Sequence, residues 1–262
     1  MHLALIGALA LTVLACRDVS PPSPSSSPSP IAVVTAAPPT SAPTPTPAPA
    51  TPTPIPTPSP TRPPGGGGPI AEAAVAKLQA DPLIVHVEQV AAVSAAGQDV
   101  TAVSSSDFAG PDFRVVVTIT AGTESNEQEI VVVGEQAWAR NGAEGFLTSV
   151  PVAALEASVT QLYKAVRLVD DPEALRFVGV ETIDGQELQH LTANGTIPYT
   201  PAAGGTGQYD VFDLYVLEDG TPVIARTEFS ATNALGLDAS GSTDFTFSKW
   251  GGPITIEPPA GS

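Results

Sequence analysis

The stretch FRVVVTITAGTESNEQEIVVVGEQAWAR, residues 113–140, decides the fold class of this chain. Every second residue at its start is apolar, and this period of two is typical of a strand with one buried face: Phe113, Val115, Val117 and Ile119. A β-branched run follows at residues 130–133, and Gly134-Glu135 turns the chain into a further segment at 136–140. The stretch therefore predicts consecutive strands joined by short turns.

Strand signals continue on both sides of this stretch. Upstream, an alternating segment presents one apolar face: Leu83, Val85 and Val87. Downstream, Asp184-Gly185 separates two segments, and this dipeptide predicts a hairpin because both turn positions need a positive φ. Further strands are expected in the last third of the chain, at residues 209–217, 222–230, 245–248 and 254–257.

Two helices complete the expected elements. Residues 70–80 have apolar side chains at helical spacing, and Asp81-Pro82 ends the helix. The second helix, residues 152–168, carries an apolar stripe at spacings of three and four: Leu155, Val159, Leu162 and Val166. Roughly ten strands with hairpin connections and two helices predict an α+β domain, in which a large, strongly curved antiparallel sheet has the helices on one face.

The only cysteine, Cys16, follows an apolar run over residues 3–15 that is too short to cross a bilayer as a permanent helix. The run is typical of a secretory signal peptide, residues 1–15, and Val13-Leu14-Ala15-Cys16 resembles the bacterial lipobox, whose cysteine receives a diacylglycerol. A chance Ala-Cys at the edge of an ordinary signal peptide is the alternative. The lipobox predicts a protein lipid-anchored through Cys16 to the extracytoplasmic face of a bacterial cell membrane.

Residues 16–68 combine the lipidated cysteine with a linker rich in Pro, Thr and Ser, with repeats such as Thr44-Pro45-Thr46-Pro47. Proline cannot donate ladder or helix hydrogen bonds, and the segment lacks the apolar mass for a core, so we expect a disordered stalk. Two interpretations of this linker stay open: a passive spacer, or a ligand for a proline-binding module. The folded domain is then expected at residues 69–262.

The chain carries 10 Lys and Arg against 27 Asp and Glu, a net charge of −17. Of these charged residues only Arg17, Asp18 and Arg62 precede residue 69, so the acidity belongs to the folded domain. Phosphate backbones would be repelled, and we expect no nucleic-acid partner.

Three parts of the domain, together with the anchor and linker, resemble the LppX/LprG family of bacterial lipoproteins, which has a LolA-like fold. They are residues 178–185 leading to His190-Leu191, residues 214–217 with 219–223, and residues 245–248 with Trp250 and 253–258. The resemblance implies a half-barrel closed on its concave face by helices, with an apolar cavity that binds acyl chains of lipids or lipoglycans during transfer across the cell envelope. A sensor or a module that holds an envelope protein, using the same half-barrel, is the alternative.

The apolar residues of the alternating strands and of the second helix are the expected wall of such a cavity: Leu83, Val85, Val87, Val115, Val117, Ile119, Leu155, Leu162 and Val166. Ordinary core packing is the other interpretation of each of them, because sequence does not distinguish a hollow barrel from a filled one.

Catalytic signatures are missing from the sequence. His86 with Glu88 could share a strand face as metal ligands, but a half-exposed strand histidine is the ordinary case. Ser104-Ser105-Ser106 is interpreted as a loop, and no nucleophile elbow, zinc-protease motif or phosphate loop occurs. We therefore expect no enzyme activity, no metal and no cofactor.

Overall fold

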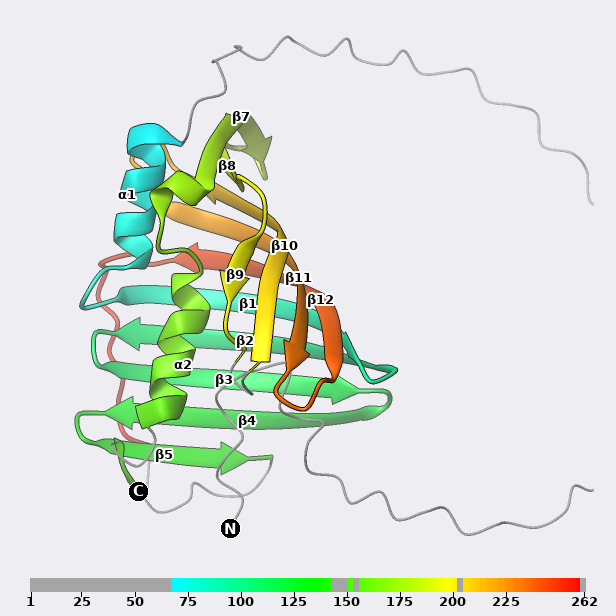
Figure 1. The fold of residues 1–262 in the computed structure, drawn as a ribbon. Coiled ribbons are helices and arrows are strands. Elements are labelled where there is room, and N and C mark those ends of the chain that lie inside the picture. The colour runs from blue at the N-terminus through cyan, green and yellow to red at the C-terminus, as the bar shows by residue number, and fades with distance from the viewer. Residues whose placement is uncertain (1–66, 143–149, 153–155, 202–204, 260–262) are drawn as a thin grey trace, which may run out of the picture. The chain divides into compact units, whose positions relative to one another are not determined.

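The computed structural model describes residues 67–142, 150–152, 156–201 and 205–259, and Figure 1 shows how their elements are arranged. The expected signal peptide, Cys16 and nearly all of the linker lie outside these residues. Within the described part, one antiparallel sheet of 12 strands runs in the order β6-β5-β4-β3-β2-β1-β12-β11-β10-β8-β7, and β9 pairs with β10 outside this path. The observed antiparallel sheet and two α-helices agree with the coarse architecture that the sequence predicts.

The bounds of the elements follow the turn signals of the sequence. The strands are β1 (Ile84–Ala95), β2 (Gln98–Ala109), β3 (Asp112–Ala121), β4 (Glu124–Val133), β5 (Gln136–Asn141), β6 (Val150–Pro151), β7 (Leu175–Ile183), β8 (Gln186–Ala193), β9 (Ile197–Tyr199), β10 (Gly205–Val216), β11 (Pro222–Asn233) and β12 (Asp238–Ser248). The helices are α1 (Gly68–Leu78) and α2 (Glu156–Arg167), with a 3₁₀ helix at Pro172–Ala174.

The alternation of apolar residues places one face of the sheet inside. Val85 and Val87 of β1 are buried, as are Phe113 and Val115 of β3, whereas the residues between them are more exposed. Val87 pairs with Phe247 of β12, so the first long strand of the domain lies beside the last one. The main core cluster therefore draws on both halves of the chain.

The Asp184-Gly185 hairpin is confirmed. Asp184 has φ 51° and Gly185 has φ 81°, and the pairing of Ile183 with Gln186 closes a two-residue turn between β7 and β8. A left-handed conformation at both positions matches the twist of the flanking strands, and glycine adopts it without a steric cost.

Two expectations were wrong. Residues 104–106 are not a loop, since they lie in the middle of β2, where the side chains of Ser104 and Ser106 point inward and Ser105 lies between them. Residues 254–257 are not a strand, because both edges of β12 are already occupied by β1 and β11 and Gly251-Gly252-Pro253 leads the chain off the sheet. Ile256 packs against the core without joining a ladder.

Helix α1 packs on the core through small side chains and lies over the turn between β10 and β11. Ala71, Ala74 and Leu78 are fully buried. The Lys77 ammonium lies 2.8 Å from the Asp219 carboxylate in that turn. A side chain at Gly220 would collide with Ala73 of the helix, at 2.6 Å, so this close approach requires glycine.

Helix α2 packs on the same cluster of buried residues as α1, through Leu162 and Val166, and Figure 1 shows it lying across the strands β2–β4. The second predicted helix is thus present, although residues 153–155 at its expected start lie outside the described part. Neither helix described in the structure is long and apolar enough to span a bilayer.

Candidate functional site

A pocket of about 580 Å³ lies between α2 and the inner face of the sheet, and we call it the inner pocket. Its wall comes from α2 and the residues that follow it, from the segment 197–201 around β9, and from β1, β2, β3, β10, β11 and β12. Strands from the first and last thirds of the described domain therefore line one cavity. Pockets of this size accommodate a single small organic ligand.

Apolar side chains make up a large part of this wall. Phe108 and Val115 contribute from β2 and β3, Leu162 and Val166 from α2, and Phe245 from β12. All five are at most 8 % exposed, so they belong to the interior of the domain and not to its outer surface.

A row of polar side chains crosses the floor of the inner pocket, and we call it the polar band: Gln89, Ser104, Ser106, Thr227 and Thr243. Ser104 pairs with Gln89 in the β1–β2 register, and Thr227 pairs with Thr243 in the β11–β12 register. The four serine and threonine side chains of the band are buried. Ser104 and Ser106 were not predicted as site residues because their segment was interpreted as a loop. Their spacing of two from each other and from Phe108 is the signal that could have placed them on the inner face of a strand.

Polar groups also gather where α2 ends. Gln79 donates hydrogen bonds from its amide nitrogen to the carbonyls of Arg167 and Val169, at 3.1 and 2.8 Å, which satisfies backbone acceptors at the end of the helix. The Arg167 guanidinium lies 5.8 Å from the centre of the Tyr163 ring. Its Nε is buried and contacts no acceptor among the described residues. Lys164 and Asp170 line the same rim.

Two tyrosines stack at the opposite side of the pocket. The rings of Tyr199 and Tyr209 are 4.9 Å apart, and Tyr199 also meets Phe229 edge-on. Burial raises the pKa of Tyr199 to about 12, and burial likewise raises the pKa of Tyr209. Both hydroxyls are therefore neutral under physiological conditions and add no charge to the cavity.

The expected cavity residues divide into three groups. Val115, Leu162 and Val166 line the inner pocket. The remaining described ones lie elsewhere in the interior: Leu83, Val85 and Val87 belong to the main core cluster, and Val117 and Ile119 to a smaller cluster with Ala91. Leu155 lies outside the described residues. Contact of any of them with lipid stays a prediction.

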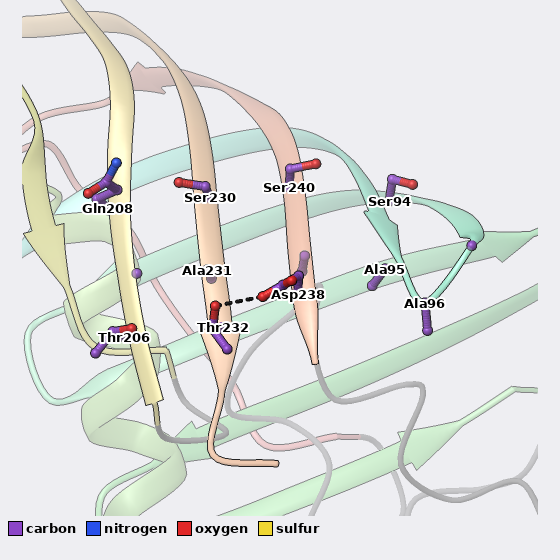
Figure 2. Close-up of a pocket in the computed structure, with 13 residues that line it drawn as sticks. Ser94, Ala95, Ala96, Thr206, Gln208, Ser230, Ala231, Thr232, Asp238 and Ser240 are labelled. Carbon is purple, nitrogen blue, oxygen red and sulfur yellow. Dashed lines mark hydrogen bonds between the residues drawn. The ribbon is translucent and has the colours of Figure 1, made fainter. Parts of the chain in front are cut away.

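A second pocket, of about 620 Å³, lies where β10, β11 and β12 meet the β1–β2 hairpin, and Figure 2 shows its lining. Its side chains are small or polar, with Ser94, Ser230 and Ser240 on neighbouring strands. Among the described residues of this lining, Asp238 is the only charged one, and it accepts a hydrogen bond from Thr232 at 2.7 Å. The pocket offers no extended apolar surface, which distinguishes it from the inner pocket.

The two histidines in the described part of the chain, His86 and His190, lie outside the linings of both pockets, and each lies between two carboxylates. His86 contacts Asp107 at 2.7 Å and Glu88 at 2.8 Å. His190 contacts Glu181 at 2.6 Å and Asp213 at 2.9 Å, and its ring stacks on Tyr215. Among the described residues no group of three or more potential ligands is arranged to hold a metal ion.

No family model and no curated protein matches the chain. Among solved structures, the chain is similar to a LolA superfamily protein from Nitrosomonas europaea, with 13 % identity over 74 % of this chain and 96 % of that one, at a TM-score of 0.28. It is also similar to a DUF1329 family protein from Desulfovibrio piger (12 % identity, 71 % and 93 % covered, TM-score 0.26).

An S-type phycobiliprotein lyase from Guillardia theta is a third similar structure, with 5 % identity over 67 % of this chain and 97 % of that one, at a TM-score of 0.24. Identities and TM-scores this low do not support a conclusion about function. The resemblance to the LppX/LprG family stays a prediction, and the function has to be argued from the residues of the inner pocket.

Proposed function

We propose that this protein is a non-enzymatic carrier that binds an acyl chain of a lipid or lipoglycan in the inner pocket. The observation that supports this most directly is the cavity of about 580 Å³, with Phe108, Val115, Leu162, Val166 and Phe245 in its wall. These five side chains complement hydrocarbon.

The energetics favour this ligand class. Each methylene transferred from water to an apolar environment contributes about 0.8 kcal/mol, so ~10 methylenes contribute about 8 kcal/mol. Association costs roughly 4 kcal/mol or more in lost translational and rotational freedom. This cost ranges up to about 15 kcal/mol, so the gain from one long chain is of the size needed to offset it and grows with chain length.

The proposed architecture is a curved half-barrel whose concave face is closed by the helices. Support comes from the wall of the inner pocket, since Val115 of β3 and Phe245 of β12 line it together with Leu162 of α2. In this arrangement α2 is the cover of the cavity, and its displacement opens the path for the chain.

We further propose that residues 1–15 are removed and that Cys16 carries the lipid anchor, with residues 16–68 as the stalk of a domain spanning 69–262. Acyl groups on Cys16 would hold the protein at the extracytoplasmic face of the cell membrane. At about 3.1 Å per residue in an extended proline-rich conformation, a stalk of this length reaches on the order of 150 Å. The domain could then reach lipids well away from its own anchor.

The test uses the mature chain, residues 16–262, with Cys16→Ser so that no acyl group is attached. Native mass spectrometry after expression, followed by titration with a fluorescent fatty acid, measures bound and added chains. We expect copurified lipid or saturable binding of the probe. A lipid-free mass together with no uptake of the probe would contradict the proposal.

A matched pair of variants on α2 locates the binding. Ala165 lines the inner pocket and is exposed, so Ala165→Trp places a large side chain at the rim without disturbing the core. Thr160 is exposed on the same helix and lies outside the pocket lining. Ala165→Trp is expected to weaken binding of the probe about fivefold or more, whereas Thr160→Trp should leave it unchanged.

A further inference from the structure

The polar band is continuous across four neighbouring strands. Gln89 of β1 pairs with Ser104 of β2, and the next inward residue along β1, Ala91, pairs with Thr243 of β12. Thr243 in turn pairs with Thr227 of β11. Hydrogen-bonding groups thus cross the floor of a cavity whose remaining wall is largely apolar.

Two hydroxyls of the polar band form hydrogen bonds with other members of the band. The Ser104 hydroxyl donates to the side-chain carbonyl of Gln89 at 3.3 Å, and the Thr227 hydroxyl donates to the backbone carbonyl of Thr243 at the same distance. These contacts are long for hydroxyl donors, which prefer about 2.7–2.8 Å.

The other donors of the band have no such contact. The hydroxyls of Ser106 and Thr243 and the amide nitrogen of Gln89 form no hydrogen bond with another described residue. Gln89 is partly exposed and none of these three groups is fully enclosed, but hydrocarbon filling the cavity would separate them from water without supplying a partner, at a cost of about 1–3 kcal/mol for each group. Hydroxyls can donate or accept, but the Gln89 amide nitrogen only donates. The complementary group on a ligand is therefore an acceptor.

The band also restricts the charge of that acceptor. None of its five members is ionisable, and the cations of the pocket lining, Lys164 and Arg167, belong to α2, so an anion placed on the band would be removed from water without a counter-charge from the band. A neutral carbonyl oxygen meets both requirements, since it accepts hydrogen bonds and carries no net charge.

We infer, on the basis of the proposed function, that the inner pocket takes a single-chain amphiphile whose chain is joined through an ester or amide carbonyl. The carbonyl oxygen accepts from Ser106, Thr243 or Gln89, and the chain lies along Phe108 and Leu162. A volume of about 580 Å³ suits one chain with its linking group.

The experiment compares two probes that differ in the carbonyl. A monoacylglycerol and the alkylglycerol ether of the same chain length are titrated against the mature chain with Cys16→Ser, with displacement of a fluorescent fatty acid as the readout. The wild-type pocket is expected to bind the acyl compound about tenfold more tightly, because the ether lacks the carbonyl acceptor.

Two double variants test the band itself. Ser106→Ala with Thr243→Val removes both free hydroxyls, leaves Gln89 as the remaining free donor of the band, and should clearly reduce the preference while leaving the affinity for the ether unchanged. Ser248→Ala with Thr246→Val makes the same substitutions at exposed positions of β12 and should behave as wild type.

Different results would contradict the carbonyl inference and the proposed function. Equal binding of both probes by the wild-type pocket, a comparison that needs no variant, would overturn the carbonyl inference and leave acyl-chain binding intact. An undiminished preference in the band variant would also overturn it. Absence of binding for both probes would overturn the proposed function together with the inference.

Discussion

The hydroxyl of Tyr163 in α2 donates a hydrogen bond to the backbone carbonyl of Gly110, in the turn between β2 and β3. The Tyr163 ring lies 5.2 Å from that of Phe108 and meets Phe113 edge-on at 5.9 Å. Aromatic packing and one hydrogen bond thereby fix the middle of α2 to the sheet. Any opening of the inner pocket by movement of this helix has to break that contact.

Substitution of Tyr163 by Phe keeps the ring contacts and removes the hydrogen bond. We expect the free energy of unfolding to fall by about 1 kcal/mol. Amide hydrogen exchange in α2 should become faster, because the helix opens more often. Urea denaturation and exchange mass spectrometry measure the two effects. Tyr199→Phe is the control, since the Tyr199 hydroxyl forms no hydrogen bond with a described residue. Equal amide exchange in the two variants would contradict the conclusion that the Tyr163 hydroxyl holds α2 on the sheet.

Glu129 on the outer face of β4 is predicted to be the main charged determinant of stability. Its carboxylate is buried and contacts Arg114 at 2.8 Å and Arg140 at 2.6 Å. Glu129→Ala should lower the free energy of unfolding by about 2 kcal/mol, less than for a fully buried pair because both arginines are partly exposed. Glu127→Ala removes an exposed partner of Arg140 and should cost less than about 1 kcal/mol. Equal effects in chemical denaturation would refute this ranking.

Phe108 joins the core to the wall of the inner pocket. It is 1 % exposed, so Phe108→Ala should destabilise the domain by about 4 kcal/mol through lost burial and the cavity left behind. Val90→Ala, on the exposed face of β1, should change stability by less than about 0.5 kcal/mol. Thermal unfolding of the two variants provides the comparison, and a small loss for Phe108→Ala would show that this part of the core is loosely packed.

Stability is expected to fall in alkaline solution as tyrosines ionise. Burial raises the pKa of Tyr163 to about 12, above its ordinary value of 10.0. A raised folded-state pKa contributes stability that is complete below the unfolded value and is lost as the pH rises through the folded value. The stability difference between wild type and Tyr163→Phe should therefore shrink between about pH 10 and pH 12. Urea denaturation at several pH values measures it, and a constant difference would exclude a contribution from Tyr163 ionisation.

Several features of the fold could be predicted from the sequence because they depend on local chemistry. The alternation around Val115 fixes which face of β3 is buried, and Asp184-Gly185 fixes a turn through backbone sterics alone. Proline after Asp81 likewise marks the end of the first helical segment. These signals act within a few residues, so no knowledge of distant partners is needed.

The errors arose where a distant partner decides the structure. Ser104-Ser105-Ser106 has low strand propensity, but β1 and β3 pair with it on both sides and hold it in β2. Residues 254–257 have the composition of a strand, yet find no free sheet edge. In both cases long-range pairing overrides local preference.

The sequence by itself determined the strand periodicity, the hairpin and the helical stripe, because each is a property of neighbouring residues. Only the tertiary structure decided that Val115 and Phe245, far apart in the chain, line one cavity with Leu162, while Val85 and Val87 of the same core cluster lie outside its lining. The alternating pattern is the same for a side chain that faces a cavity and for one that faces another side chain. What distinguishes them is the register of β1 against β12 and the position of α2, both set by contacts between segments remote in sequence.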